Sequence, residues 1–405
     1  MEQILQNYAT LIVRRGATVR PGKPVVIQVD TSQSAFACML AAEAYRAGAS
    51  HVEILWSDEQ LEFLQYSYET VDQLTSIPTC KVEHLLHYLR QDASYIRLVS
   101  QNPFNLEKVE ADKRSAGLQA SQQAFQEKQD LVMNHTIPWC IAAVPGEAWA
   151  KLVYPEEAQP VEALWRCIAA CCYCDQAPLL RWDKHIRRIK HRLEKLNSMD
   201  LDRLWFVSEN GTNLTIGLCE HHQWNGGDSV TPNGVRFSPN LPTEELYTVP
   251  HKDRTNGIVV STRPLSVSGT VLKAGFQLVY RNGCVTEILA KDQHDQTVLE
   301  DIFQNDPGAR RLGEVALVDY DNPIGKSKRM FYSTLFDENA ACHLAMGNGI
   351  RTALKTSPDE DTQTCGLNQA KIHLDFMIGT RDTKCIGISK SQKNYLLMEH
   401  GNILI

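Results

Sequence analysis

The sequence predicts an α/β plus β chain, in which an N-terminal α/β domain with a mostly parallel sheet precedes a portion that begins as antiparallel β structure. Helix-like and strand-like stretches alternate through the first 145 residues, and the apolar period changes to two after about residue 200. The 405 residues are 43% hydrophobic and 22% charged, enough to bury a large core. We expect an α/β domain over 1–145, a helical connection over 146–200 and a β-rich portion over 201–405.

The N-terminal elements follow from the spacing of apolar residues. These residues recur at helical spacing over 2–14, and a run rich in β-branched residues over 23–30 predicts a strand. The next helix is predicted to end near Gly48, because glycine readily adopts the left-handed conformation that stops a helix. Residues 51–56 and 95–99 predict further buried strands. Strands that alternate with helices imply right-handed crossovers and a largely parallel sheet.

The first predicted strand carries no dinucleotide-binding fingerprint. Residues 30–34 (DTSQS) follow it where a GxGxxG turn would be needed to cradle a pyrophosphate. We therefore expect the N-terminal domain to act as a scaffold.

The middle of the chain changes from helix to hairpin patterns. Helices are predicted over 161–174 and 182–196, and the second is strongly basic on its outer face. Beyond them, Asn210-Gly211 and Asn282-Gly283 interrupt alternating apolar residues. This dipeptide favours tight hairpins because both of its residues tolerate a positive φ.

Composition excludes several classes of protein. With 41 basic and 48 acidic side chains the net charge is -7, so we expect no nucleic-acid partner. No basic leader with an apolar core begins the sequence, and no apolar run approaches the roughly 18 residues that span a bilayer. The 12 cysteines are scattered and are expected to be reduced thiols. We expect a soluble, cytoplasmic protein with no membrane partner.

Two motifs that resemble metal sites have simpler interpretations. The densest cysteine group lies within one apolar helix and favours cysteine as a small buried hydrophobe over a zinc site. Its members are Cys167, Cys171, Cys172 and Cys174. In the pair His221-His222, adjacent strand residues point to opposite faces, so at most one imidazole could serve a given site. We expect this segment to be a turn near the site and not a ligand.

A more specific pattern of acids and histidines is dispersed over the last 165 residues. Glu245 lies in a short extended stretch between two prolines, where acids are usually solvated. Glu314 lies inside the apolar strand predicted over 311–318, where a lone carboxylate is costly to bury unless it is paired or bound to a metal.

The other candidates occupy a predicted helix and a predicted strand. Asp337 is expected to cap a helix that contains His343. Glu338 and His343 do not share one face of an ideal helix, so they could bind the same metal centre only if Glu338 lies at the fraying start of the helix. His373 and Asp375 project to one side of a strand predicted over 373–379 and form a platform for a divalent ion.

Charge relates these candidates to a pair of metal ions. Four carboxylates and two neutral imidazoles would balance two divalent cations, and the oxygen-rich mixture suits zinc, cobalt, manganese or magnesium. Separate buried polar groups are the alternative, which spacing alone leaves open. The six candidates are Glu245, Glu314, Glu338, His343, His373 and Asp375.

Long blocks of the chain resemble the thermophilic metallopeptidase family of aminopeptidases T, S and II. The resemblance covers essentially the whole chain, and the blocks keep their order. They are AAEAYRAGASHVEILW, HHQWNGG, NLPTEELYTVP, RRLGEVALV, DNPIGK, TLFDENAACHLAMG and HLDFMIG.

The resemblance implies a function and a site. The family's metal ligands fall on the six candidates, with Glu314 bridging two divalent ions and Glu314 and Glu338 as candidates for proton transfer. It implies a metal-dependent aminopeptidase, a hydrolase that removes the N-terminal residue of short peptides. It also implies a β-barrel with further α/β structure in the C-terminal portion, carrying the dinuclear site, and a homodimer.

Two departures from the family pattern put the activity in question. In the family, a tyrosine that is suited to donating a hydrogen bond to an oxyanion usually lies seven residues after the counterpart of His343. Here that position is Ile350. The family's Asn-x-Ser becomes 368–370 with Ala370 in place of serine. Losing one oxyanion donor typically costs about 100-fold to 1000-fold in turnover. The alternative function is therefore a weak or inactive homologue that binds peptide or metal.

Other residues and other reactions complete the hypotheses. Tyr332 is a candidate substitute for the missing phenol, although an aromatic residue in such a segment more often serves packing. Lys326 is a candidate to contact a substrate carbonyl or carboxylate, although a lysine in such a loop is more often simply exposed. A third hypothesis is a hydrolase of another amide or of a phosphate ester.

Overall fold

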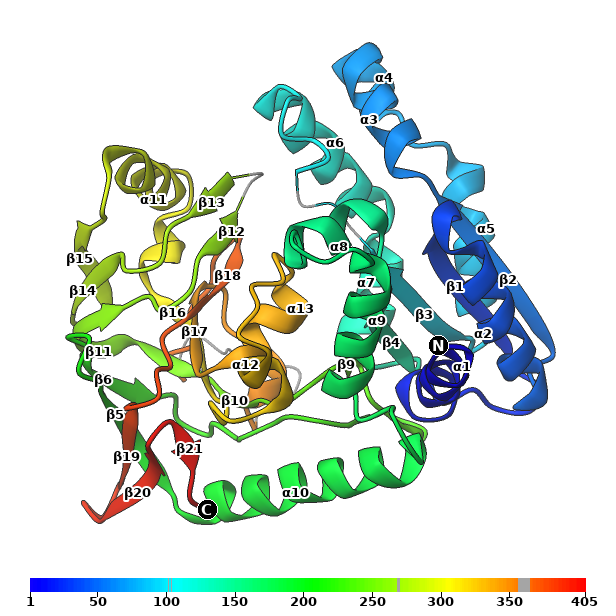
Figure 1. Ribbon diagram of the computed structural model, residues 1–405. Coiled ribbons are helices and arrows are strands. Elements are labelled where there is room, and N and C mark those ends of the chain that lie inside the picture. The colour runs from blue at the N-terminus through cyan, green and yellow to red at the C-terminus, as the bar shows by residue number, and fades with distance from the viewer. Residues whose placement is uncertain (101, 103, 268–269, 356–364) are drawn as a thin grey trace. The chain divides into compact units, whose positions relative to one another are not determined.

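The computed structural model describes residues 1–405 except 101, 103, 268–269 and 356–364 (Figure 1). The chain forms two compact units, each built from discontinuous segments. The first contains Met1–Ile186 and Asp228–Pro242, and the second contains Arg187–Gly227 and Thr243–Ile405. The domain boundaries predicted at residues 145 and 200 stay predictions.

The first unit contains a five-stranded parallel sheet; the sequence predicted a largely parallel sheet and three of its strands, β1, β2 and β3. The order of its strands is β2-β1-β3-β4-β9, and every neighbouring pair is parallel. The strand at 51–56 was expected to be buried, but β2 lies at the sheet edge and both of its ends are exposed. The strands are β1 (Pro24–Asp30), β2 (His51–Ser57), β3 (Ser94–Val99), β4 (Trp139–Ala143) and β9 (Asn240–Leu241).

Helices surround this sheet, and Leu85 and Leu86 of α5 pack against Val26 and Tyr95 of the sheet. Helix α1 continues as a π-helical turn over Ile12–Gly16, and α2 ends two residues before Gly48, whose φ is 95°. A 3₁₀ turn spans Thr31–Gln33, and β7 (Ser229–Val230) pairs with β8 (Arg236–Phe237). The helices are α1 (Glu2–Leu11), α2 (Ser34–Arg46), α3 (Glu59–Tyr68), α4 (Val71–Thr75), α5 (Thr79–Leu89), α6 (Ala111–Ala124), α7 (Gln126–Met133), α8 (Glu147–Val153) and α9 (Pro160–Cys171).

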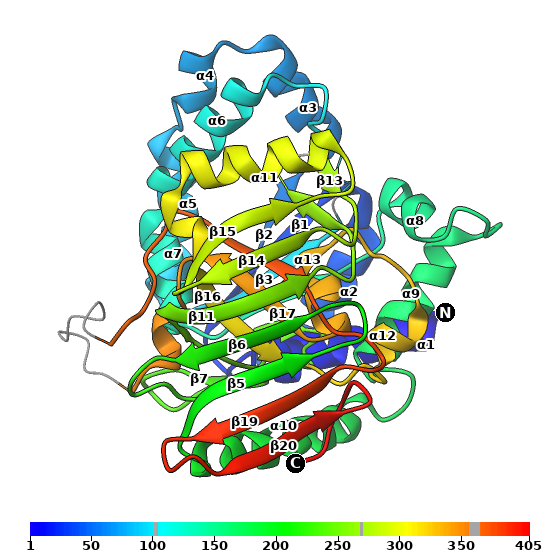
Figure 2. The ribbon, with the colours of Figure 1, turned by 90° about the vertical axis from the view of Figure 1, so that its left-hand side faces the viewer.

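The second unit contains an open eight-stranded antiparallel sheet. Its order is β15-β14-β11-β6-β5-β19-β20-β21, and Figure 2 shows these strands from β15 to β20 side by side. In the described pairings β15 and β21 remain at opposite edges, so the barrel that the resemblance implied is corrected to an open sheet. The strands are β5 (Leu201–Val207), β6 (Asn213–Leu218), β11 (Pro250–Val260), β14 (Gln277–Arg281), β15 (Cys284–Leu289), β19 (Lys384–Ser389), β20 (Asn394–Glu399) and β21 (Asn402–Ile403).

Both predicted Asn-Gly hairpins are present in that sheet. The first joins β5 to β6, and the second joins β14 to β15 with φ values of 48° at Asn282 and 79° at Gly283. These positive angles are those a tight hairpin turn requires.

A smaller antiparallel sheet of the second unit carries the candidate site. Its order is β10-β16-β17-β18, with β10 (Leu246–Thr248), β16 (Leu312–Leu317), β17 (His343–Gly347) and β18 (His373–Met377). The helix predicted through Asp337 and His343 is wrong. Helix α13 (Thr334–Asp337) gives way to a 3₁₀ turn at Glu338–Ala340, and His343 begins a strand buried on both faces. Such a strand is continuously apolar and has no period that separates it from a buried helix.

The remaining elements connect these sheets. Helix α10 (Pro178–Ser198) begins in the first unit and ends in the second. Within the described part of the chain, no helix combines the length and apolar character that crossing a membrane requires. The others are β12 (Leu265–Val267), β13 (Thr270–Leu272), α11 (Gln293–Asn305), a 3₁₀ turn at Pro307–Arg310, α12 (Pro323–Ser327) and a 3₁₀ turn at Arg351–Ala353.

Candidate metal centre

The candidate side chains rise from one face of the four-stranded sheet. Glu314 lies opposite Ala345 of β17, which in turn lies opposite Asp375 of β18. Directly opposed residues of an antiparallel sheet share a face, and so do residues two apart on one strand. His343 and His373 are two residues from Ala345 and Asp375, so four of the candidate side chains, those of Glu314, His343, His373 and Asp375, lie on this face.

Glu314 lies between the two imidazoles. Its Oε1 is 3.5 Å from Nε2 of His343, and its Oε2 is 3.1 Å from Nε2 of His373. His343 Nε2 also lies 3.4 Å from Glu245 Oε2, and His373 Nε2 lies 3.3 Å from Asp375 Oδ1. Five predicted ligands therefore form two groups that share Glu314, and the potential ligand atoms of each group lie within 4.8 Å of one another.

The other nitrogen of each ring fixes its orientation. His343 Nδ1 donates to the backbone carbonyl of Glu338 at 2.8 Å, and His373 Nδ1 donates to that of Asn348 at 2.7 Å. A carbonyl only accepts, so each Nδ1 carries a proton and each Nε2 faces the carboxylates. Metal-binding histidines commonly use one nitrogen for a backbone carbonyl and the other for the metal.

The buried acids create a strongly negative field. Burial lowers the pKa of His373, but Asp375 and Glu314 outweigh burial and raise that pKa to about 11. Burial likewise lowers the pKa of His343, and Glu245 and Glu314 raise it well above the ordinary value. Burial raises the pKa of Glu314, yet the two imidazoles lower it to about 2. A field that holds protons on two buried imidazoles also attracts metal cations.

A buried oxygen tests whether the site fits a cation. Asp375 Oδ1 is buried, and its separation of 3.3 Å from His373 Nε2 does not have the geometry of a hydrogen bond. Leaving a buried carboxylate oxygen without a donor is costly, and a neutral Nε2 would direct its lone pair at carboxylate oxygens. A divalent cation between these atoms relieves both problems, and the oxygen-rich donor set with two imidazole nitrogens suits such an ion.

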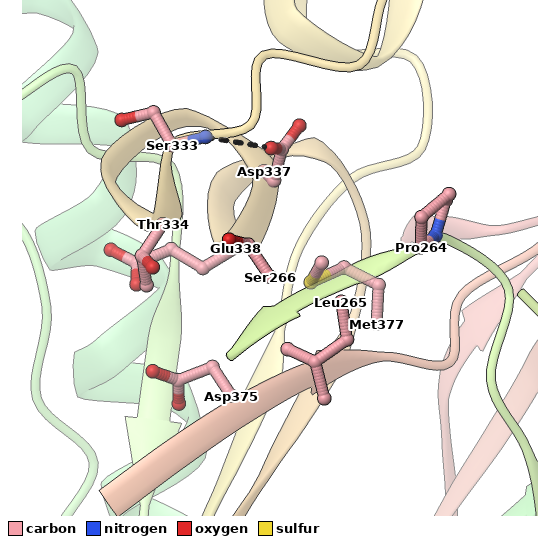
Figure 3. Close-up of a pocket in the computed structure, with 9 residues that line it drawn as sticks. All are labelled: Pro264, Leu265, Ser266, Ser333, Thr334, Asp337, Glu338, Asp375 and Met377. Atoms are coloured by element: carbon pink, nitrogen blue, oxygen red, sulfur yellow. Dashed lines mark hydrogen bonds between the residues drawn. The ribbon is translucent and has the colours of Figure 1, made fainter. Parts of the chain in front are cut away.

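Glu338 stands apart from both ligand groups in the described structure. Its carboxylate lines a small pocket that also contains Asp375 and Thr334 (Figure 3). Figure 3 shows the carboxylates of Glu338 and Asp375 on one side of this pocket, away from Leu265 and Met377. Burial raises the pKa of Glu338 well above its ordinary value, and the charges of Glu245 and Asp375 add to the effect.

Backbone contacts that the sequence did not signal hold the acids in place. The backbone N–H of Glu244 donates to Asn339 Oδ1 at 2.7 Å, next to Glu245. The Glu244 carboxylate instead lies 3.4 Å from Arg188. Asn225 exchanges two backbone hydrogen bonds of 2.9 Å with Tyr247, two residues beyond Glu245. The sequence offered one signal for Tyr247: it lies two residues after Glu245, and residues two apart on a strand share a face.

The other singled-out residues lie outside the two ligand groups. His222 Nδ1 donates to the carbonyl of Cys219 at 2.9 Å, and all 12 cysteines are free thiols. Ile350 packs against a buried cluster that includes Cys219 and Leu354. Lys326 is exposed on α12, and Tyr332 is partly buried in the turn before α13. The backbone N–H of Ala370 donates to Asn348 Oδ1 at 3.3 Å.

Comparison with known proteins identifies the family. A family model described as thermophilic metalloprotease (M29) matches residues 1–403. The chain belongs to this family. It is 32% identical to aminopeptidase 2 of Geobacillus stearothermophilus over 99% of this chain and 98% of that protein. It is also 32% identical to aminopeptidase T of Thermus thermophilus, with the same two coverages.

A solved structure agrees with this assignment. Wild-type AmpT from Thermus thermophilus superposes with a TM-score of 0.94 and 31% identity, covering 100% of both chains. The M29 chain is accordingly a hydrolase of the metalloaminopeptidase class, and its family implies divalent metal ions.

Proposed function

We propose that the chain removes the N-terminal residue from short peptides at a pair of divalent metal ions. The observation that carries this proposal is the position of Glu314, whose two carboxylate oxygens each approach a different imidazole. A carboxylate shared by two ligand groups is the arrangement that a bridged pair of ions requires.

The ligands divide between two ions in this proposal. Glu245, Glu314 and His343 would hold one ion, and Glu314, His373 and Asp375 would hold the other. Zinc, cobalt, manganese and magnesium all fit these donors. When bound, such a pair supplies an acidified water and a polarised carbonyl.

Glu338 carries the proton in this mechanism. Its carboxylate faces the pocket, whereas Glu314 is engaged by both imidazoles. Glu338 accepts a proton from the attacking water and returns it to the leaving amine. The carboxyl oxygens of Glu338 and Asp375, which line the pocket, can accept hydrogen bonds from the α-ammonium group of a peptide, and this favours a free N-terminus over an internal bond. A homodimer and a cytoplasmic location stay predictions.

Measuring turnover and metal together tests this function. The full chain, loaded with cobalt or zinc, should hold two ions and hydrolyse amino-acid amides and short peptides. Glu314→Gln should lose turnover and retain fewer ions, because one shared ligand serves both groups. The matched control is Glu287→Gln, an exposed acid on β15 that should leave both quantities unchanged.

The absence of donors at Ile350 and Ala370 favours the second candidate, a homologue that binds metal or peptide without turnover. That candidate is supported if the chain holds two ions and cleaves no peptide or amide. Turnover of phosphate esters without turnover of peptides would support a different hydrolase.

A further inference from the structure

Tyr247 presents a phenol on the ligand-bearing face of the small sheet. It lies opposite Ala316 on the edge strand β10, and Ala316 lies opposite His343. The shared face of directly opposed residues places Tyr247 on the side of the sheet that carries His343. It also follows Glu245 by two residues and is diagonal to Glu314, two residues before Ala316.

Neighbouring loops hold this phenol at the site edge. Asn225 exchanges two backbone hydrogen bonds of 2.9 Å with Tyr247. Asn225 Nδ2 also donates to the carbonyl of Thr352 at 2.8 Å.

Tyr247 reaches the region where Ile350 replaces a phenol. Both side chains pack against the same buried cluster, which includes Val249 and Leu354. One hydroxyl donor is therefore present beside the ligands, on β10 and not on the loop that follows β17.

We propose that the Tyr247 hydroxyl donates a hydrogen bond to the oxygen of the scissile carbonyl as negative charge develops there. The inference rests on the proposed peptidase function. Water adds to the carbonyl carbon, and the carbonyl oxygen takes the electron pair of the C=O π bond. That pair re-forms the C=O bond when the C–N bond breaks. The O–H bond of Tyr247 stays intact throughout, because Tyr247 supplies a hydrogen bond and transfers no proton.

Removing only the hydroxyl tests this inference. Tyr247→Phe should lower kcat by about 100-fold to 1000-fold, the usual effect of losing one oxyanion donor. KM, the metal content and the midpoint of thermal unfolding should stay close to those of the parent chain. Tyr280→Phe is the matched control, since it removes a buried hydroxyl that accepts or donates no hydrogen bond among the described residues. That variant should keep the parent kcat.

A second phenol and a bound inhibitor provide independent readouts. Ile350→Tyr, added to Tyr247→Phe, should recover at least tenfold in kcat by supplying a donor from the neighbouring loop. An aminophosphonate peptide that mimics the tetrahedral intermediate should bind Tyr247→Phe more weakly by about the factor lost in kcat, whereas KM should not change.

The outcomes distinguish this inference from the proposed function. An active parent with Tyr247→Phe within twofold of its kcat would overturn the role of Tyr247 and leave the peptidase function standing. Loss of metal or of folding in Tyr247→Phe would also overturn it, because the phenol would then be structural. A metal-loaded parent with no turnover would overturn both.

Discussion

At the scale of single residues, the candidate site is a problem of charge. Glu245, Glu314 and Asp375 lie around two imidazoles with little access to water, and Glu338 lines the pocket beside them. Like charges at such separations repel strongly in a medium of low dielectric constant, so the acids require positive charge between them. Glu314 contributes most to this arrangement, because it alone contacts both imidazoles.

Substituting Glu338 separates proton transfer from metal binding. Glu338→Gln should keep both ions and lose about 100-fold or more in turnover, because an amide cannot accept the proton of the attacking water. Elemental analysis and steady-state kinetics on the same sample check this expectation. Loss of one ion in Glu338→Gln would show instead that Glu338 is a ligand, the role that the family resemblance implied.

At the scale of elements, the edge strand β10 is positioned by the loop before it. Asn225 pairs with Tyr247, and Gly226 comes so close to β10 that an added Cβ would lie 2.3 Å from the carbonyl oxygen of Glu245. The φ of Gly226 is 156°, which L side chains rarely adopt. The segment 221–227, expected as a turn near the site, thus holds the backbone of Glu245 in place.

Gly226→Ala should therefore weaken the site through the backbone. We expect a loss of roughly 1–3 kcal/mol in the free energy of unfolding, from strain and from the contact with Glu245. Metal affinity should fall as well, because Glu245 must move. Denaturant unfolding and metal titration measure the two effects. Gly234→Ala is the matched control, since Gly234 has a φ of 86° but no heavy atom within 4 Å of an added Cβ. Equal metal affinity in both variants would contradict this role for Gly226.

At the scale of the whole molecule, all six candidate residues belong to the second compact unit, although they are spread over the chain from Glu245 to Asp375. Bound cations would relieve the repulsion among the buried acids only in the folded state. Metal binding and the stability of this unit should therefore be coupled.

Chelation should lower the thermal stability of the second unit. At a free metal concentration of about 100 times Kd, one ion stabilises a folded protein by about 2.7 kcal/mol. Differential scanning calorimetry with and without chelator should show a lower unfolding midpoint for the metal-free chain. The midpoint of Glu314→Gln should respond much less to added metal. A parent chain whose midpoint ignores both metal and chelator would contradict the coupling.

The sequence predicted local elements wherever a single pattern dominates. The parallel strands β1, β2 and β3, both Asn-Gly hairpins and the strands of Glu314 and Asp375 follow from β-branched runs, turn residues and buried apolar runs, whereas β4 and β9 were not predicted. The helix through His343 was wrong because residues buried on both faces have no period. The barrel was wrong in turn because closure of a sheet depends on which strands meet at its edges, and spacing along the chain does not report this.

The sequence by itself determined which chemical groups are available. It supplies six candidate acids and histidines in blocks of fixed order, and it has isoleucine instead of tyrosine at position 350. Only the tertiary structure decided which of these groups meet. It placed both oxygens of Glu314 near different imidazoles, separated Glu338 from the two ligand groups and brought Tyr247 onto their face. The reason is physical, because coordination and hydrogen bonding depend on distances of a few ångströms between residues that the register of four strands brings together.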